Sequence, residues 1–397
     1  MNFFDNYELQ REELLARIAQ ELELNPSRKE RMELAYAKVL EVLKKDEVFF
    51  TDLEIELYAQ GSVRIKTTVR PLKKDDFDLD TVLHIYDVHG KYDPAKIYNA
   101  LVRVIESDPF FKTICEKKDR CIRLNYKDDF HIDILPGCMV SLEDRDRIAI
   151  PEKKLQSWSS GNPKGFASWF LDKSKSPETY MLKAFSATLI KAEVDAEPLP
   201  DDSLYDKTPL QRSVQLVKRY RDIYFENRDN RVSSIVITTL MGMYYNGEES
   251  IYDTIDNILS HIKLGYDQAI QKGQRFKVLN PVDNQEDFTD SWTQANYDSF
   301  YAFIDDLYAK WERLKQKFDK SGDEYIKLFG EGLYKESLRN QAKLLGRFAK
   351  DSAEATTGLV LNQAAKTDKS GVINPTQGIR NEPHRNFGGS PETRASK

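Results

Sequence analysis

The chain has 397 residues, of which 40% are hydrophobic and 31% charged, a composition typical of a folded protein and not of a disordered one. Its 59 basic and 65 acidic residues give a net charge of −6, which disfavours a long nucleic-acid groove. No apolar run approaches the roughly 20 residues that span a bilayer, and the charged start lacks a signal-peptide core, so we expect a cytoplasmic protein with no membrane partner.

The first part of the chain mixes helix and strand patterns. Up to about Asp46, apolar residues at helical spacing predict two helices separated at 25–27. A further helix is expected at 93–107. Alternating apolar residues predict four strands, of which the last two form a hairpin, at 54–59, 77–85, 120–126 and 130–135. This mixture predicts an α+β domain over residues 1–205.

After the segment 161–170 the pattern is almost wholly helical. Asn162 followed by Pro163 is typical of a helix N-cap and first turn. We expect a helical domain over 206–352. Beyond it, residues 353–397 are rich in Thr, Gly, Asn and Pro, which indicates an extended tail that is ordered only where it docks. Apolar spacing predicts the helices of the domain at 206–226, 231–246, 251–272, 291–318 and 322–352.

Three aspartates follow the alternating pattern of two predicted strands. Because strand side chains alternate between faces, Asp78 and Asp80 share one face of their strand, and Asp133 takes the polar face of another. If the strands are neighbours, the three carboxylates meet. Two like charges about 4 Å apart repel by roughly 4 kcal/mol in a partly buried site, so the cluster would take up protons or bind cations. Carboxylates suit hard ions, and we predict two Mg²⁺ ions, with Mn²⁺ as a substitute.

A Gly-Ser turn precedes these aspartates. Gly61 lets the backbone approach a phosphate closely, and the Ser62 hydroxyl and nearby amides can donate hydrogen bonds to its oxygens. A phosphate-binding turn, a carboxylate pair and a third carboxylate on a later strand together predict a site for nucleotidyl transfer.

Each feature also has a simpler explanation. A Gly-Ser dipeptide alone is a turn, an Asp-x-Asp pair can protect an exposed edge strand, and Asp133 can pair with Arg123. Asp76 shares the face of Asp78 and is an alternative partner for it; we favour Asp80, which lies within the apolar run. The ordered combination favours the catalytic interpretation.

Cysteine and histidine show no metal-binding pattern. The cysteines at 115, 121 and 138 fit a reducing compartment. The five histidines are scattered along the chain, so we expect no zinc site.

The acidic residues and the turn resemble a known family. Gly61-Ser62, Asp78-x-Asp80 and Asp133 look like the signature of DNA polymerase β-like nucleotidyltransferases. Over about 58–389, the surrounding segments resemble the bacterial cGAS/DncV-like nucleotidyltransferases, the CD-NTases. The segments that carry this narrower resemblance include YAQGS, TTVRP, DFDLD, HIDILPG, SWSSGNPKGFASWF, TPLQRSVQLVKRYRD, SSIVITTLM, LNPVDNQEDFTDSW and PHRNFGG.

The resemblance implies both a fold and an activity. A polymerase β-like lobe with a mixed sheet would face a helical lobe akin to that of oligoadenylate synthetases, with the active site in the cleft. The enzyme would join nucleoside triphosphates (ATP, and also GTP, CTP or UTP) into a cyclic di- or trinucleotide by two-metal phosphoryl transfer. This second messenger would be read by a separate effector in anti-phage (CBASS) defence.

The resemblance also assigns roles to residues on both sides of the cleft. The metals would be held by Asp78, Asp80 and Asp133. The triphosphate would be bound by Gln60, Gly61, Ser62, Lys218 and Ser234, with Ser233 as an alternative to Ser234. Lys66-Thr67-Thr68 stands where many members have Gly-Thr, so we expect a differently shaped acceptor side. The zinc insertion of the animal DNA-sensing relative is absent, so no nucleic-acid activator is expected.

Two other functions fit parts of the pattern. A linear template-independent nucleotidyltransferase, of the oligoadenylate or poly(A) type, would use the same acidic site. A non-catalytic nucleotide-binding scaffold would keep the fold, although the presence of all three aspartates disfavours it.

Overall fold

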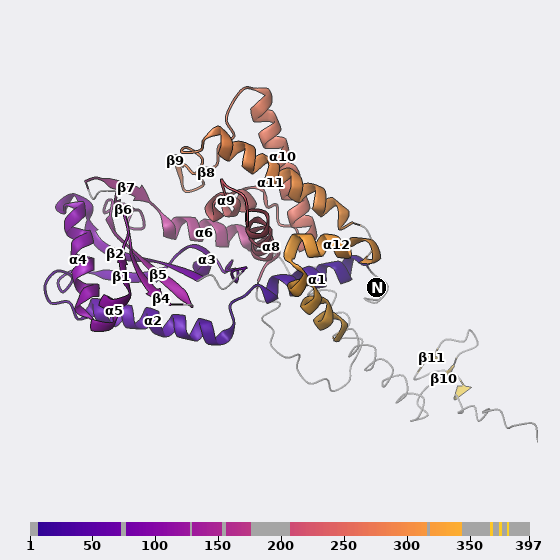
Figure 1. Cartoon of the computed structure of the whole chain (residues 1–397), viewed down its shortest axis with the longest axis horizontal. Helices are drawn as coiled ribbons and strands as arrows, with labels where there is room; N and C mark the ends of the chain where they lie inside the picture. The colour runs from indigo at the N-terminus through magenta and orange to yellow at the C-terminus, as the bar shows by residue number, and fades with distance from the viewer. Residues whose placement is uncertain are drawn as a thin grey trace, which may run out of the picture. The chain divides into compact units, whose positions relative to one another are not determined.

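The computed structural model of the chain describes residues 7–72, 77–127, 129–152, 156–175, 207–315 and 318–343, together with three short strands between 366 and 380. The described parts of Met1–Lys183 and Asp201–Leu338 form one compact unit, which Figure 1 shows in colour. A second unit comprises Ala184–Pro200 and Arg339–Lys397. Asp76 and the predicted domain boundaries at residues 205 and 352 lie outside the described residues.

A seven-stranded mixed sheet organises the N-terminal half. Its central strands β2 and β5 run parallel, whereas the other pairs are antiparallel. The predicted hairpin of the third and fourth strands is confirmed, because β4 and β5 pair around a short turn. The strands lie in the order β1 (Ile55–Ala59), β2 (Phe77–Val88), β5 (Phe130–Met139), β4 (Ile122–Tyr126) and β3 (Cys115–Lys117), with β6 (Ile148–Pro151) on β5 and β7 (Trp158–Gly161) on β6.

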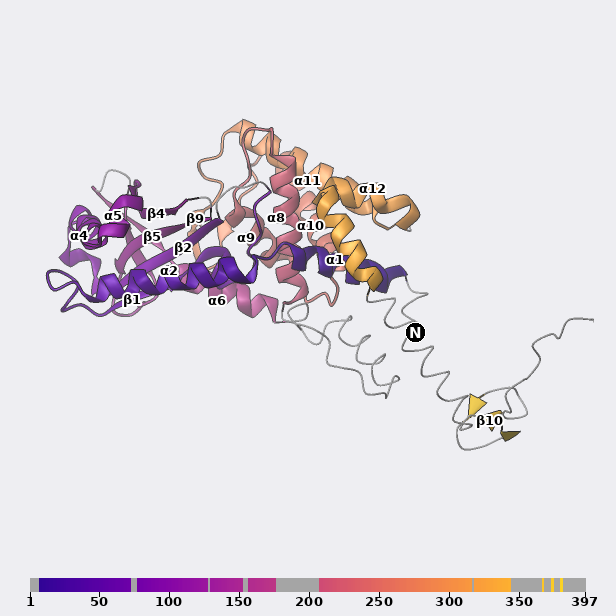
Figure 2. The same cartoon turned by 60° about the horizontal axis from the view of Figure 1, so that its bottom comes forward.

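Two helices cover the apolar face of this sheet. α2 (Pro26–Lys44) and α4 (Pro94–Ser107) each start with a proline after a capping side chain, Asn25 and Asp93. Figure 2 shows α2 lying alongside the strands. Side chains from both helices and from alternate positions of β2 and β5 form one buried core, including Val39, Leu101, Leu83 and Ile132. The opposite face of β2 and β5 carries polar residues at the start of each strand and a small apolar cluster, which includes Val82 and Leu135, further along.

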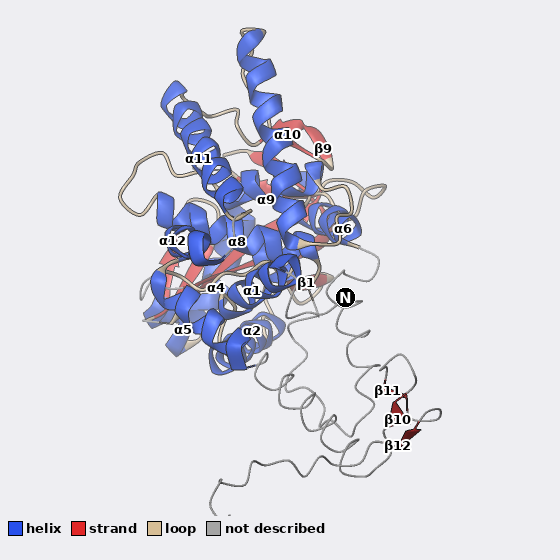
Figure 3. Ribbon diagram, turned by 90° about the vertical axis from the view of Figure 1, so that its right-hand side faces the viewer, coloured by secondary structure: helices blue, strands red, loops and turns tan. Residues whose placement is uncertain are grey.

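The helices of the second half pack around α8 (Pro209–Tyr224), whose start is fixed by a capping box between Thr208 and Gln211. α10 (Ile251–Gln271) and α11 (Gln294–Arg313) lie side by side (Figure 3). α9 (Ser234–Tyr244) contacts both α8 and α10.

The first helix, α1 (Tyr7–Glu21), belongs to this helical layer. It contacts α8 and α10, and the Glu12 carboxylate accepts hydrogen bonds from the first two amides of α10, at Ile251 and Tyr252. A carboxylate at a helix N-terminus satisfies amides that have no partner within the helix. The N-terminal helix is thus anchored to residues far along the chain.

One predicted helix is divided in two. Apolar spacing predicts a single helix over 322–352, but the structure has α12 (Phe318–Phe329) and a further helix over 331–343. Gly330 separates them, because its φ of +93° lies in the left-handed region that ends an α-helix. Residues 344–352 lie outside the described residues.

Smaller elements complete the fold. The N-cap predicted at Asn162 is confirmed, because its side chain accepts a hydrogen bond from the Gly165 amide at 2.8 Å. None of the helices in the described residues has the length and apolar character needed to cross a bilayer. The remaining elements are α3 (Gly61–Arg64), a 3₁₀ turn (His89–Lys91), α5 (Pro109–Ile114), α6 (Pro163–Ser174), the hairpin of β8 (Leu279–Asn280) and β9 (Asp283–Asp287), and the tail strands β10 (Lys366–Thr367), β11 (Ile373–Asn374) and β12 (Ile379–Arg380).

Leu101 tests the contribution of the core between sheet and helices. Its side chain is fully buried, so Leu101→Ala should lower the free energy of unfolding by about 2–5 kcal/mol, measured by urea denaturation. Leu264→Ala is the matched control, because Leu264 is 56% exposed on α10 and should change stability by no more than about 0.5 kcal/mol. Equal effects of the two substitutions would contradict this core assignment.

Candidate functional site

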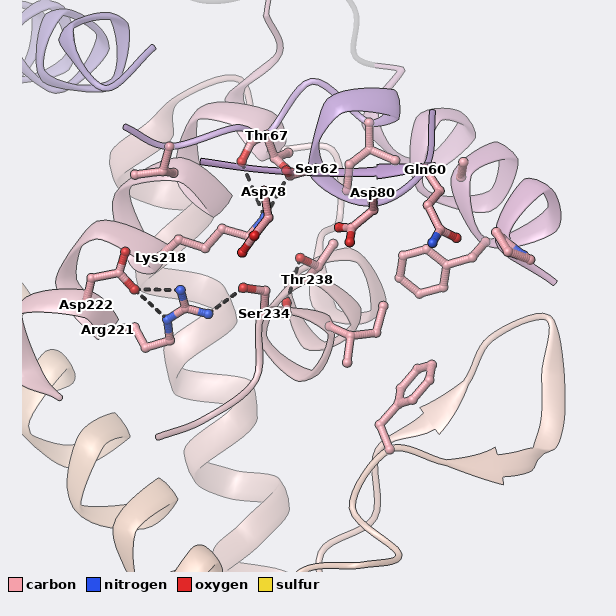
Figure 4. A pocket seen from close by; sticks show the side chains of 18 of the residues that line it. Gln60, Ser62, Thr67, Asp78, Asp80, Lys218, Arg221, Asp222, Ser234 and Thr238 are labelled. Carbon is pink, nitrogen blue, oxygen red and sulfur yellow. Dashed lines mark hydrogen bonds and ion pairs between the residues drawn. The ribbon is translucent and has the colours of Figure 1, made fainter. Parts of the chain in front are cut away.

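A pocket of about 940 Å³ lies between the polar face of the sheet and the helical layer. Figure 4 shows it from close by. Its walls come from the turn at α3, the starts of β2 and α6, the C-terminal half of α8, the start of α9 and the β8–β9 hairpin. All the predicted site residues except Asp133 line it: Gln60, Gly61, Ser62, Asp78, Asp80, Lys218 and Ser234.

The Gly-Ser turn lies directly against Asp80. Gly61 has a φ of +59°, in the left-handed region that side chains disfavour. A Cβ atom on Gly61 would lie 3.0 Å from Oδ2 of Asp80, and the Gln60 amide donates a hydrogen bond to the Asp80 carbonyl at 2.9 Å. Glycine is therefore required for both the shape of the turn and its approach to the carboxylate.

The strand register brings the aspartates together as predicted. β2 and β5 are neighbours, and Asp80 stands directly beside Asp133, whereas Asp78 stands beside His131. Burial raises the pKa of Asp80 to about 6, and the nearby charges of Asp133 and Asp78 add to this rise. The carboxylate of Asp80 is thus in an environment that disfavours its own negative charge.

Asp133 is held by a neighbouring strand. Arg123 of β4 donates two hydrogen bonds to it, from Nε to Oδ1 and from Nη2 to Oδ2, both at 2.7 Å. Nη2 of Arg123 also lies 3.4 Å from Oδ1 of Asp78. The pairing of Asp133 with Arg123, one of the simpler explanations considered from the sequence, is therefore present alongside the acidic cluster.

The donor chemistry of Asp78 and Asp80 fits a hard divalent ion. Among the described residues, no hydrogen bond or ion pair engages the Asp80 carboxylate, and carboxylate oxygens are ligands that Mg²⁺ favours. Asp133 has the same chemistry, but both of its oxygens accept from Arg123. Accordingly, no group of three or more His, Cys, Asp or Glu side chains in the described part of the chain is arranged to hold a metal ion.

One face of α8 holds the segment that follows the Gly-Ser turn. Side chains spaced three or four residues apart point to the same side of a helix. Three such side chains of α8 donate hydrogen bonds to backbone carbonyls along the segment 65–70: Gln211 to Ile65 at 3.1 Å, Gln215 to Thr68 at 2.7 Å and Arg219 to Arg70 at 2.9 Å. The helical layer therefore fixes the position of a loop in the sheet layer.

Lys218 belongs to the same face of α8. Its Nζ donates to Oγ1 of Thr67 at 3.1 Å and to the Thr67 carbonyl at 3.3 Å (Figure 4). Burial and, to a smaller extent, the positive charge of Arg221 lower the pKa of Lys218 to about 7. The positive charge of this ammonium group at the pocket wall is therefore only partly neutralised by the protein, which suits an anionic ligand.

Arg221 brings a second cation to the pocket. It donates to the Ser234 hydroxyl and forms an ion pair with Asp222 (Figure 4). Asp222 also pairs with Arg231. Ser234 lines the pocket, whereas Ser233 is the N-cap of α9 and does not. Of the two serines considered from the sequence, Ser234 is the one placed beside the pocket's basic residues.

The β8–β9 hairpin adds pocket residues that the sequence patterns did not single out: Asn280, Glu286 and Phe288. Asn280 is buried, and its Nδ2 donates to the Glu286 carboxylate at 2.7 Å. An ion pair between Arg147 and Asp283, at 2.7 Å, joins the hairpin to the loop before β6. A strand of two residues paired with one of five polar residues gives almost no periodic signal, so tertiary contacts identify this wall.

Gly61→Ala tests the contact between turn and carboxylate. The left-handed φ and the 3.0 Å approach to Asp80 should together lower the free energy of unfolding by about 1–2 kcal/mol or more, measured by urea denaturation. Gly90→Ala is the control, since a Cβ there would meet no atom within 4 Å. If Gly61→Ala were as stable as Gly90→Ala, the close approach would be disproved.

The chain is similar in sequence to known cyclic dinucleotide synthases. Residues 10–174 match the Second Messenger Oligonucleotide or Dinucleotide Synthetase (SMODS) domain. A c-di-GMP synthase of Roseivirga ehrenbergii is 36% identical over 348 residues, 86% of this chain and 90% of that protein. The cyclic dinucleotide synthase CdnG of Bradyrhizobium diazoefficiens is 26% identical over 252 residues, 60% of this chain and 59% of that protein.

Solved structures show the same architecture. The structure of the CD-NTase CdnG of Bradyrhizobium diazoefficiens in complex with GTP superposes with a TM-score of 0.68 at 21% identity, covering 83% of this chain and 98% of that one. The predicted α+β fold, a polymerase β-like sheet lobe with a helical lobe, is confirmed. Together with the 36% identical relative, these matches show that the chain is a nucleotidyltransferase and belongs to the bacterial cGAS/DncV-like nucleotidyltransferases, the CD-NTases.

Proposed function

We propose that this chain joins two GTP molecules into a cyclic dinucleotide, c-di-GMP, by two-metal phosphoryl transfer. The c-di-GMP synthase that is 36% identical over most of the chain supports the product. The related CdnG, a cyclic dinucleotide synthase whose structure contains GTP, supports guanine as the base.

The observation that carries the proposal is the opposition of charges across the pocket. The sheet side presents Asp78 and Asp80 beside the Gly-Ser turn, and the helical side presents Lys218 and Arg221. A nucleoside triphosphate with bound cations has matching charges, because its phosphates need positive partners and its cations need carboxylates.

Each side of the pocket has a proposed task in binding the donor nucleotide. The backbone at Gly61 and the hydroxyl of Ser62 would donate hydrogen bonds to phosphate oxygens, with Gln60 beside them. Lys218 and the Arg221–Ser234 pair would neutralise the triphosphate tail from the opposite wall. Asp78, Asp80 and Asp133 would hold the ions. Two divalent cations, Mg²⁺ or Mn²⁺, would supply charge neutralisation and activation of the acceptor hydroxyl.

The reaction is a displacement at phosphorus. A ribose hydroxyl oxygen of the acceptor bonds to the α-phosphorus of the donor, the bond to pyrophosphate breaks, and the hydroxyl proton is lost, with Asp133 as the proposed acceptor. A second transfer within the linear intermediate closes the ring and releases a second pyrophosphate.

The proposed biological role is signalling. The cyclic product would be a second messenger read by a separate effector in anti-phage (CBASS) defence, and the synthase would act in the cytoplasm. The match to a second-messenger synthetase domain supports the first part, and three free cysteines in the described residues suit a reducing compartment.

Product analysis tests the reaction. With labelled NTPs and Mg²⁺, we expect a product made from GTP that survives phosphatase and has the mass of c-di-GMP. Asp80→Asn should reduce its formation at least about a hundredfold, because a metal ligand contributes several kcal/mol, whereas Asp87→Asn on the same strand, outside the pocket, should not. A phosphatase-sensitive ladder would indicate a linear polymerase, and binding without pyrophosphate release would indicate a scaffold.

The low pKa of Lys218 predicts pH-dependent nucleotide binding. A bound triphosphate stabilises the ammonium form, so binding takes up a proton, and the affinity for a non-hydrolysable GTP analogue should fall as pH rises from 7.5 to 8.5, by up to about tenfold. Calorimetric titration of Lys218→Met should give weaker binding whose affinity does not fall between pH 7.5 and 8.5. Lys91→Met, which removes an exposed lysine paired with Asp87, should behave like the wild type. A wild-type affinity that is independent of pH would contradict the uptake of a proton by Lys218 on binding.

A further inference from the structure

A row of charged side chains crosses four strands next to the pocket. The strand register places Asp80, Asp133, Arg123 and Glu116 directly beside one another on β2, β5, β4 and β3. Residues opposite each other on neighbouring strands point to the same face of a sheet, so Arg123 stands between two carboxylates of one face. We call these four residues the charged row.

Arg123 takes the position where a cation is needed. Its guanidinium donates to both oxygens of Asp133 at 2.7 Å and lies 3.4 Å from Asp78. The planar fork of an arginine engages both oxygens of a carboxylate at once, so an ion that binds Asp133 competes with this pair. The protein thus neutralises part of the acidic cluster with a residue of its own.

Arg123 has a second acidic neighbour. Glu116, on its other side in the charged row, is about half exposed and is held by Lys118 at 2.5 Å and by Asn125 at 3.4 Å. Lys118 is itself exposed and has a flexible side chain, so Glu116 can accept an additional donor at little energetic cost. Glu116 is the direct cross-strand neighbour of Arg123 on β3, as Asp133 is on β5.

We propose that Arg123 is an internal counterion that competes with a divalent cation for Asp133 and that exchanges Asp133 for Glu116 when the cation binds. This inference rests on the metal site of the proposed function. It makes the third carboxylate available only when a cation replaces the guanidinium, so the complete acidic site forms together with its ligand.

Binding of Mn²⁺ to the full-length protein without nucleotide tests the competition. Electron paramagnetic resonance of free Mn²⁺ gives the affinity, and Asp80→Asn defines the background of ions bound elsewhere. Arg123→Met should bind Mn²⁺ at least about tenfold more tightly than the wild type, because a competing positive charge is removed. Its ion-free form should melt at a lower temperature than the wild type, and Mn²⁺ should raise its melting temperature by more than that of the wild type.

The matched control is Arg145→Met. Like Arg123, Arg145 lies on the sheet side and pairs with a carboxylate, that of Glu54 at 3.4 Å. Neither Arg145 nor Glu54 lines the pocket. Its Mn²⁺ affinity should equal that of the wild type. If Arg123→Met bound Mn²⁺ equally or more weakly, Arg123 would be a positioning residue for Asp133, and the competition would be disproved.

Glu116→Gln tests the exchange of partners without removing the arginine. Loss of the alternative carboxylate should weaken Mn²⁺ binding several-fold while leaving the melting temperature of the ion-free protein unchanged, since Glu116 is exposed. An unchanged affinity would refute the role of Glu116. If the wild type showed no binding beyond the Asp80→Asn background, the proposed metal site would be absent. The proposed competition between Arg123 and the cation would then also be refuted.

Discussion

The site depends on one electrostatic constraint, the crowding of carboxylates on the polar face of β2 and β5. The register that buries the alternate apolar residues of both strands also places Asp80 beside Asp133. Burial, together with the resulting repulsion, raises the pKa of Asp80 to about 6. The fold therefore maintains an unfavourable concentration of charge, which stays in place because the apolar core on the other face fixes the register.

The helical layer places positive charges across the pocket from these carboxylates. Its helix α8 both anchors the loop after the Gly-Ser turn, through Gln211, Gln215 and Arg219, and presents Lys218 and Arg221 to the pocket. The positions of the turn and of the basic residues are thus linked through one rigid element. A ligand with phosphates and cations, as in the proposed function, would relieve the unfavourable charge on both walls at once.

Local patterns predicted the parts of the site that one strand or one turn determines. Alternation placed Asp78, Asp80 and Asp133 on the polar faces of adjacent strands, and Asn162 was identified as a cap from its proline neighbour alone. The resemblance supplied Lys218 and Ser234, but not the contact of Lys218 with Thr67, which depends on how α8 packs. Likewise, the division at Gly330 depends on a backbone angle that apolar spacing does not encode, and the pocket wall at Glu286 depends on tertiary packing.

A crystal structure of the protein with Mn²⁺ and a non-hydrolysable GTP analogue would show most directly whether the crowded carboxylates bind cations, because anomalous scattering locates the ions. We expect manganese peaks within coordination distance of Asp78 and Asp80, with the triphosphate between the Gly61 turn and Lys218. A triphosphate bound elsewhere, or no manganese beside Asp80, would contradict it.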